Sequence, residues 1–172
     1  EMWVKPTDTI VLTSETTSGI SANLATPNQK FVVYPGHGGP SNGGIGISVG
    51  TNGVAVYEHG DGHFPSVLVY AGSLSNWTHI AVVYDNKTPN LYINGTHVRT
   101  GLTSLRTNVF PTAGVGTSYG NYIGYVDNFR IWNSVRTQTQ ISNNMYLEVP
   151  SPTTGMIAHY RFNSNTNASV GT

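Results

Sequence analysis

The densest group of side chains able to do chemistry is the segment Glu58–His63, which reads EHGDGH. Together with His37, which stands in another glycine-rich stretch, it offers three imidazoles and two carboxylates. Such groups bind a transition metal or Ca²⁺, or hydrogen-bond sugar hydroxyls, and the glycines let a ligand approach the backbone. The spacing of His59 and His63 would suit a zinc site if both residues lay on one face of a helix. A strand end and a turn are expected here instead. The other interpretation is a solvated hairpin in which Asp61-Gly62 supplies the turn.

A tyrosine next to this segment suggests a sugar ligand. Tyr57 alternates with Val54 and Val56, which predicts that its ring points away from the core and shares a face with His59. Exposed rings stack on the apolar face of a sugar while nearby amides and carboxylates bind its hydroxyls. The predicted ligand-binding residues are His37, Tyr57, Glu58, His59, Asp61 and His63.

Other aromatic residues divide into two groups. Tyr119 and Tyr122 flank Gly120-Asn121, in a loop that could expose both rings. The tryptophans start or lie within expected strands, where large aromatic side chains usually belong to the core. We therefore expect the core to contain Trp3, Trp77 and Trp132.

The elements that must position these residues are short strands. In residues 78–85, apolar β-branched and aromatic residues alternate with period two, and a turn cluster at 86–90 contains Pro89, where a strand cannot continue. Asn94-Gly95 predicts a two-residue hairpin turn because both residues tolerate positive φ. Further strands are expected at 10–13, 20–25, 30–34, 45–49, 54–59, 67–71, 96–100, 113–117, 122–133 and 156–162, with one helical turn at 137–145. The pattern predicts an all-β fold of two antiparallel sheets packed face to face.

Composition limits the function. A chain of 172 residues fits one domain, 1–172, with a full sandwich core. Only 9% of its residues are charged and the net charge is zero, so no basic surface favours nucleic acid or an anionic membrane. No apolar run is long enough to cross a bilayer. The chain contains no cysteine, which excludes a disulfide framework. In an extracellular protein, this absence fits a bacterial origin.

Four segments resemble, in order, the motifs of laminin-G-like domains, the concanavalin A-like jelly rolls. EMWVKP at residues 1–6 is similar to the family's early EaWVKP strand, and 77–95 resembles its central strand pair. GYVDNFRIWN at 124–133 resembles the G-x-iDevRiyn strand, and GMIAHYRF at 155–162 the closing GLvayyrF strand. The resemblance implies a concanavalin A-like sandwich. It also implies that the family's first strand is missing and that the domain comes from a longer protein.

The resemblance also bears on metal binding and catalysis. It implies that Asp127 helps to hold a structural Ca²⁺, since an anionic oxygen beside backbone carbonyls suits a hard cation. The other interpretation of Asp127 is a hydrogen bond that fixes the strand. Glucanases of this fold place their carboxylates on one strand in E-x-D-x-x-E-like spacing, whereas none of the glutamates has an acidic neighbour two residues away: Glu1, Glu15, Glu58 and Glu148. We expect no catalysis, with a lyase that uses His and Tyr as an open alternative.

The combined expectation is an extracellular, secreted or cell-surface binding module without catalytic activity. Its predicted ligand is a glycan or a surface polymer, bound with or without Ca²⁺, and neighbouring domains of the same chain are further candidate partners. The alternative is a structural spacer or a protein–protein adhesion domain. Exposed stacked aromatic rings would favour sugar, whereas an exposed apolar edge strand would favour a protein neighbour.

Overall fold

The computed structural model describes residues 1–20, 29–112, 119–149 and 153–163, and almost all of its regular structure is β. The predicted all-β fold is therefore confirmed. In chain order the elements are β1 Met2–Pro6, β2 Phe31–Val33, β3 Asn42–Gly50, β4 Gly53–His59, β5 Ser66–Ala71, β6 Thr78–Asp85, β7 Thr88–Ile93, β8 Thr96–Thr100, β9 Asn108–Pro111, β10 Gly124–Asp127, β11 Phe129–Trp132, α1 Gln138–Asn144 and β12 Met156–Tyr160.

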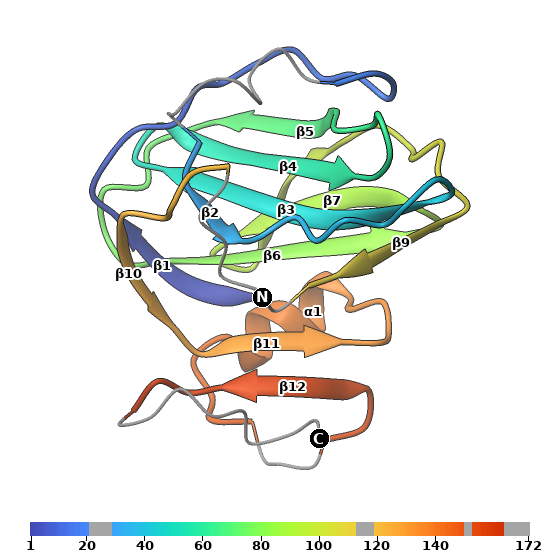
Figure 1. Ribbon diagram of the computed structural model, residues 1–172. Coiled ribbons are helices and arrows are strands. Elements are labelled where there is room, and N and C mark those ends of the chain that lie inside the picture. The colour runs from blue at the N-terminus through green and yellow to red at the C-terminus, as the bar shows by residue number, and fades with distance from the viewer. Residues whose placement is uncertain (21–28, 113–118, 150–152, 164–172) are drawn as a thin grey trace.

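Two sheets face each other and form the predicted sandwich (Figure 1). Sheet one has the order β10-β1-β6-β7-β8, and sheet two has the order β2-β3-β4-β5. β9 adds to sheet two by pairing with β3 in parallel, which departs from the expected wholly antiparallel arrangement. The strands β11 and β12 pair with each other and form a separate ribbon below the two sheets.

The main core lies between the sheets and follows the period of two. From sheet one it takes Met2, Val4, Ile80 and Leu91, and from sheet two it takes Ile45, Ile47, Val49, Val54, Val56 and Leu68, all of them buried. Since alternate residues of a strand point to opposite faces, Trp3 and His79 lie on the outer face of sheet one. That outer face carries the aromatic residues described below.

The turns confirm some expectations and correct others. Asn94-Gly95 forms the predicted turn, with positive φ at both residues. β6 and β7 are joined at Asn86-Lys87, also with positive φ, and Pro89 lies inside β7 opposite Tyr84 rather than ending a strand. The expected continuous strand at 122–133 is interrupted at Asn128, which has φ 50° and separates β10 from β11.

A second apolar cluster lies on the outer face of sheet two. It consists of Ile10, Phe31, Ala55, Tyr57 and Phe64, all buried. Tyr57 thus points away from the main core, as expected, but its ring is 1% exposed because residues outside sheet two cover it. The expectation that Tyr57 presents an open ring to a ligand is corrected by this packing.

Helix α1 covers the outer face of sheet one. Its N-terminus has a capping box: the Thr137 side chain accepts from the backbone N–H of Gln140, whose side chain accepts from the backbone N–H of Thr137. Ile141, its buried residue, packs against Ala81 and Val83 of β6. Among the described residues, no helix is long and apolar enough to cross a membrane.

Candidate functional site

The structure gathers three of the predicted ligand residues at one end of sheet two, where β4 finishes, a group we call the histidine corner (His37, His59 and Asp61). His37 Nε2 lies 2.9 Å from Asp61 Oδ1, and the rings of His37 and His59 meet edge to face at 4.8 Å. The side chains of His37 and Asp61 are about half exposed. The glycine-rich loop and the end of β4 are therefore close together, as the prediction required.

The polar groups of the histidine corner are already engaged. His59 Nδ1 donates to the Pro35 carbonyl at 2.9 Å, and its Nε2 lies 3.5 Å from the Tyr119 hydroxyl. Burial lowers the pKa of His59, so its ring is neutral at pH 7. His37 Nδ1 accepts from the backbone N–H of Gly39. Each imidazole thus fixes the loop to the hairpin.

The remaining predicted ligand residues lie elsewhere, which corrects the picture of a single cluster. Glu58 is 0% exposed because it points between the sheets, where Tyr84 and Ser104 donate to its carboxylate. Burial raises the pKa of Glu58. His63 is also buried, with Nε2 3.7 Å from Glu58 Oε2, and burial lowers its pKa to about 4. Tyr57, Glu58 and His63 are therefore out of reach of a surface ligand.

The described residues contain no cluster of three side chains of the types that commonly bind metals. Among residues 1–20, 29–112, 119–149 and 153–163, no three His, Asp or Glu residues gather as ligands. Asp127 Oδ1 accepts from the Asn128 backbone N–H, and Asn128 Oδ1 lies 3.1 Å from His159 Nε2. Asp127 thus has a local hydrogen bond, and the calcium site that the resemblance implies at this residue stays a prediction.

A different feature surrounds Asp127. It is an open cleft of about 430 Å³ at the outer face of sheet one. We call it the aromatic cleft, lined by Trp3, Trp77, Asp127, Asn128, Met145, Tyr146, Leu147, Glu148 and Asn163. Three aromatic rings thus share one depression with two carboxylates and two amides.

The pairing of strands in sheet one determines which side chains form the base of this cleft. Trp3 of β1 is paired with Asp127 of β10 on one side and with His79 of β6 on the other. Paired residues share a face, so the three side chains form one row on the outer surface. The Trp3 ring meets the His79 ring at 5.4 Å, and Trp3 Nε1 donates to the Met145 carbonyl at 2.9 Å. Trp3 is thereby fixed as the floor of the cleft.

The walls of the cleft come from the segments before β6 and after α1. Trp77, one residue before β6, is 45% exposed, and Tyr146 is 74% exposed. The Tyr146 ring lies 5.2 Å from the Trp3 ring, and the exposed Tyr125 ring lies 6.4 Å from Trp77. Single exposed rings are common on protein surfaces, whereas exposed rings gathered in one place are a feature of interaction sites. The expectation that Trp77 belongs to the core is wrong.

The polar groups of the cleft complement these rings. Asp127 and Asn128 lie at the end of β10, and Glu148 follows α1 with its carboxylate 2.9 Å from Arg161 Nη1. Carboxylates and amides accept and donate hydrogen bonds in fixed directions beside apolar ring faces. The arrangement can therefore hold a ligand that has both an apolar face and several hydroxyl groups.

Sequence reasoning missed this cleft because its members are far apart along the chain. The sequence predicts Asp127 as a metal ligand and places the tryptophans in the core. One available signal was the position of Trp77 directly after Ser75-Asn76, because a ring at the junction of a loop and a strand can remain exposed. Tyr119 and Tyr122, by contrast, are partly buried, and Tyr119 stacks on Tyr34 at 5.6 Å.

Comparison with known proteins gives a family match and two relatives. The laminin G model of the Concanavalin A-like lectin/glucanases superfamily matches residues 1–142. Pappalysin-1 of Homo sapiens is 34% identical over 77 residues, which cover 40% of this chain and 5% of that protein. Pappalysin-1 of Mus musculus is 32% identical with the same coverage. The chain thus spans about 5% of the length of these relatives.

Two solved structures are also similar. One is a "putative carbohydrate binding protein" from Bacteroides ovatus ATCC 8483, with a TM-score of 0.56 and 16% identity over 95% of this chain and 50% of that chain. The other is an S-layer domain-containing protein from Clostridium thermocellum ATCC 27405, with a TM-score of 0.31 and 19% identity over 76% of this chain and 69% of that chain. The first of these shares the fold.

Proposed function

We propose that this chain, which belongs to the Concanavalin A-like lectin/glucanases superfamily, is a non-catalytic module that binds a glycan or a surface polymer in its aromatic cleft. The observation that carries the proposal is the exposure of the Trp77 and Tyr146 rings in one depression with Asp127 and Asn128. A Bacteroides ovatus protein of the same fold is described as a putative carbohydrate binding protein, which supports the proposal.

The binding step follows from the chemistry of the cleft. A pyranose has an apolar face of C–H groups and a rim of hydroxyls. The Trp77 and Tyr146 rings offer flat apolar surfaces for the C–H face, and burying these surfaces removes apolar area from water. Asp127 accepts hydrogen bonds from hydroxyls, and the Asn128 amide can donate or accept them. Trp3 provides the floor, where the Met145 carbonyl and the His79 ring orient its indole.

Absence of catalysis is part of the same proposal. A retaining glycosidase needs two carboxylates about 5 Å apart, one of them acting as a protonated acid. Of the two carboxylates that line the cleft, Glu148 is ion-paired with Arg161 and Asp127 accepts from a backbone N–H. A bound oligosaccharide is expected to remain intact after prolonged incubation with the protein.

We place the module outside the cell or on its surface. This placement is supported by a surface that relies on Asn, Ser, Thr and Gly for solubility, with charged residues at 9% of the chain. An antibody raised against the domain should label intact cells of the source organism. Labelling that requires permeabilised cells would contradict the placement.

A glycan array tests the proposal, with fluorescently labelled protein applied once in Ca²⁺ and once in EDTA. We expect a restricted set of oligosaccharides to bind, with equal signal in both buffers because no cluster of three His, Asp or Glu side chains includes Asp127 in the described part of the chain. Trp77→Ala should lose at least tenfold in affinity. Phe110→Ala is the matched control, since Phe110 is an exposed ring on β9 outside the cleft.

Two results of the array would count against the proposal. No bound glycan in either buffer would contradict a glycan ligand, and equal loss in both variants would contradict the aromatic cleft as its site. Glycan binding in the Ca²⁺ buffer alone would contradict metal-independent binding. It would support the predicted Ca²⁺ site at Asp127.

A further inference from the structure

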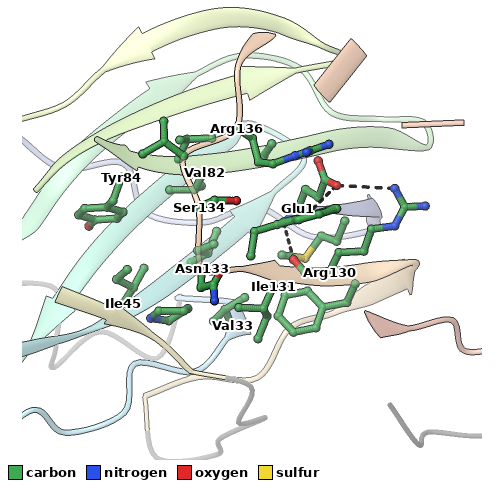
Figure 2. A pocket seen from close by; sticks show the side chains of 18 of the residues that line it. Glu1, Val33, Ile45, Val82, Tyr84, Arg130, Ile131, Asn133, Ser134 and Arg136 are labelled. Carbon is green, nitrogen blue, oxygen red and sulfur yellow. Dashed lines mark hydrogen bonds and ion pairs between the residues drawn. The ribbon is translucent and has the colours of Figure 1, made fainter. Parts of the chain in front are cut away.

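Two depressions in the described part of the molecule differ in the charge of their linings. One, of about 310 Å³ between β6 and β11, contains Glu1 together with Arg130 and Arg136 (Figure 2). Arg130 Nη1 lies 3.6 Å from Glu1 Oε1, so the carboxylate there has a cation beside it. The other is the aromatic cleft, whose described lining has two carboxylates, those of Asp127 and Glu148, and no lysine or arginine. This difference restricts the class of glycan that the aromatic cleft can accept.

Each carboxylate of the aromatic cleft has one oxygen engaged within the protein. Asp127 Oδ1 accepts from the Asn128 backbone N–H at 2.8 Å, and Glu148 Oε1 lies 2.9 Å from Arg161 Nη1. Within residues 1–20, 29–112, 119–149 and 153–163, no donor bonds to Asp127 Oδ2 or Glu148 Oε2. Carboxylates form their strongest hydrogen bonds with charged donors. The second oxygen of each carboxylate is therefore available to a cationic group on a ligand.

Two cationic side chains lie near the cleft without lining it. Arg161 is the ion-pair partner of Glu148, and its side chain is only about one-third exposed. Lys5 lies on the same face of β1 as Trp3, but it is two residues further along the strand and is paired with Tyr125. The cation nearest to the cleft is therefore already matched by a carboxylate.

The histidines next to the cleft add no positive charge. The His79 ring lies 5.4 Å from the Trp3 ring, and His159 Nε2 lies 3.1 Å from Asn128 Oδ1. Burial lowers the pKa of each histidine to about 4, so both rings are neutral at pH 7. A glycan with uronate or sulfate groups would bring negative charge beside Asp127 without a cation in the described lining to receive it. The cleft therefore disfavours acidic glycans.

The aromatic rings add a requirement on the shape of the sugar. Trp77 and Tyr146 offer flat surfaces, which stack best on a sugar face that no axial hydroxyl interrupts. In a β-linked glucosamine unit all ring substituents are equatorial, so both faces consist of C–H groups and the amine lies at the rim. The face can then stack on a ring while the ammonium approaches a carboxylate. An ammonium is also attracted to the face of an aromatic ring.

We propose that the ligand of the aromatic cleft is a polymer of amino sugars with free, unacetylated amines, whose ammonium groups bind Asp127 and Glu148. This inference rests on the proposed function, since it names the class of glycan that the cleft binds. Acetylation of the amine removes the positive charge and leaves one neutral N–H donor in place of three charged ones. An acetylated or neutral sugar would therefore stack on the same rings but leave the charge of the two carboxylates unmatched.

Three oligosaccharides test this proposal on the chain of residues 1–172. The probes are the β-1,4-linked hexamers of glucosamine and of N-acetylglucosamine, and a hexamer of galacturonate, measured by calorimetry at about pH 6, where the sugar amines are protonated. We expect the glucosamine hexamer to bind at least tenfold more tightly than the acetylated one and the galacturonate hexamer not to bind. Raising NaCl from about 50 mM to about 500 mM should weaken the glucosamine hexamer several-fold and leave the acetylated one unchanged, because salt screens exposed charges.

Asp127→Asn separates a bound ammonium from a general attraction of the cationic probe. The asparagine keeps an oxygen that can accept from the Asn128 backbone N–H, but it removes the charge. It should reduce the preference for the glucosamine hexamer several-fold. Asp61→Asn in the histidine corner changes the net charge of the protein by the same amount and should leave the preference unchanged. Equal reductions in the two variants would overturn the proposal.

The remaining outcomes distinguish this inference from the proposed function. Equal or tighter binding of the acetylated hexamer would overturn the amino-sugar proposal, as would the absence of binding by both hexamers. If array glycans bind and Trp77→Ala weakens them while the hexamers show no such preference, the proposed function stands and the amino-sugar proposal alone fails. If no glycan binds at all, both fail. If Asp127→Asn does not fold, the hexamer comparison at the two salt concentrations on the unaltered protein still decides.

Discussion

The histidine corner and the aromatic cleft both combine rings with carboxylates. They differ in whether these groups contact one another or remain exposed to solvent. In the corner, His37 pairs with Asp61 and His59 bonds the Pro35 carbonyl, so the polar groups bind one another. In the cleft, the Trp77 and Tyr146 rings face solvent above Asp127. A compact polar motif in the sequence can therefore serve only to hold two loops together through hydrogen bonds. A binding surface requires groups that folding leaves available, and these come from several elements.

Acidification has the largest expected effect on stability. It tests the buried histidines that lie next to each of the two regions. His79 packs beside Trp3 of the cleft, and His63 closes the hairpin that carries Asp61. Burial lowers the pKa of each histidine to about 4. Both are neutral when folded, whereas the unfolded chain takes up protons below about pH 6.5. Stability is therefore full above pH 6.5 and declines as the pH falls toward 4.

The contribution of His79 alone should be ~2 kcal/mol in the free energy of unfolding between pH 7 and pH 4.5. Glu58 acts in the opposite direction, because its raised pKa favours the protonated folded form. Urea unfolding at several pH values measures the slope, and His79→Gln should flatten it while His97→Gln, at an exposed position, should not. An unchanged slope in His79→Gln would contradict the burial of a neutral ring beneath the cleft.

Gly44→Ala has the next largest expected effect, and it should damage the corner alone. A Cβ at Gly44, which pairs with His59, would lie 1.7 Å from the Gly36 carbonyl oxygen, so the loop that carries His37 must move. Overpacking of this kind costs about 1–3 kcal/mol. Denaturant unfolding measures the loss, and glycan affinity measured well below the melting temperature should be unchanged. Unchanged stability would show that the loop is not held against β3.

Asp61→Asn has the smallest expected effect. It alters the contact between the His37 ring and the Asp61 carboxylate, both of which are about half exposed. Even a fully charged pair at such exposure contributes only ~0.5 kcal/mol, so the melting temperature should change little. Glycan affinity in the same variant should equal that of the unaltered protein. A tenfold loss of affinity would move the binding site from the cleft to the corner.

More of the fold than of the candidate site could be predicted from the sequence. Period-two alternation and the Asn94-Gly95 turn are local signals, and the ordered motifs carried the resemblance to laminin-G-like domains that the family match confirms. Strand pairing across the chain is not local. Trp3, Asp127 and His79 form one row only through the order β10-β1-β6, which no segment specifies by itself.

Burial explains the remaining differences. The alternation of β4 correctly placed Tyr57 away from the main core, but the chain forms a second cluster that covers it. Glu58 alternates to the inner face, where a carboxylate is unexpected, and is retained there because Tyr84 and Ser104 donate to it. Sequence patterns show which face a residue takes, whereas other elements decide whether that face is covered.

The most direct test of the account is an NMR titration of the isotope-labelled protein with the strongest glycan from the array. The account predicts that the shifted signals gather at the Trp77 indole N–H and at the backbone amides of Asp127, Asn128 and Tyr146. The histidine corner should be unchanged. Shifts gathered at His37, His59 and Tyr119, with the Trp77 indole unaffected, would contradict the central claim that this module binds glycan in its aromatic cleft.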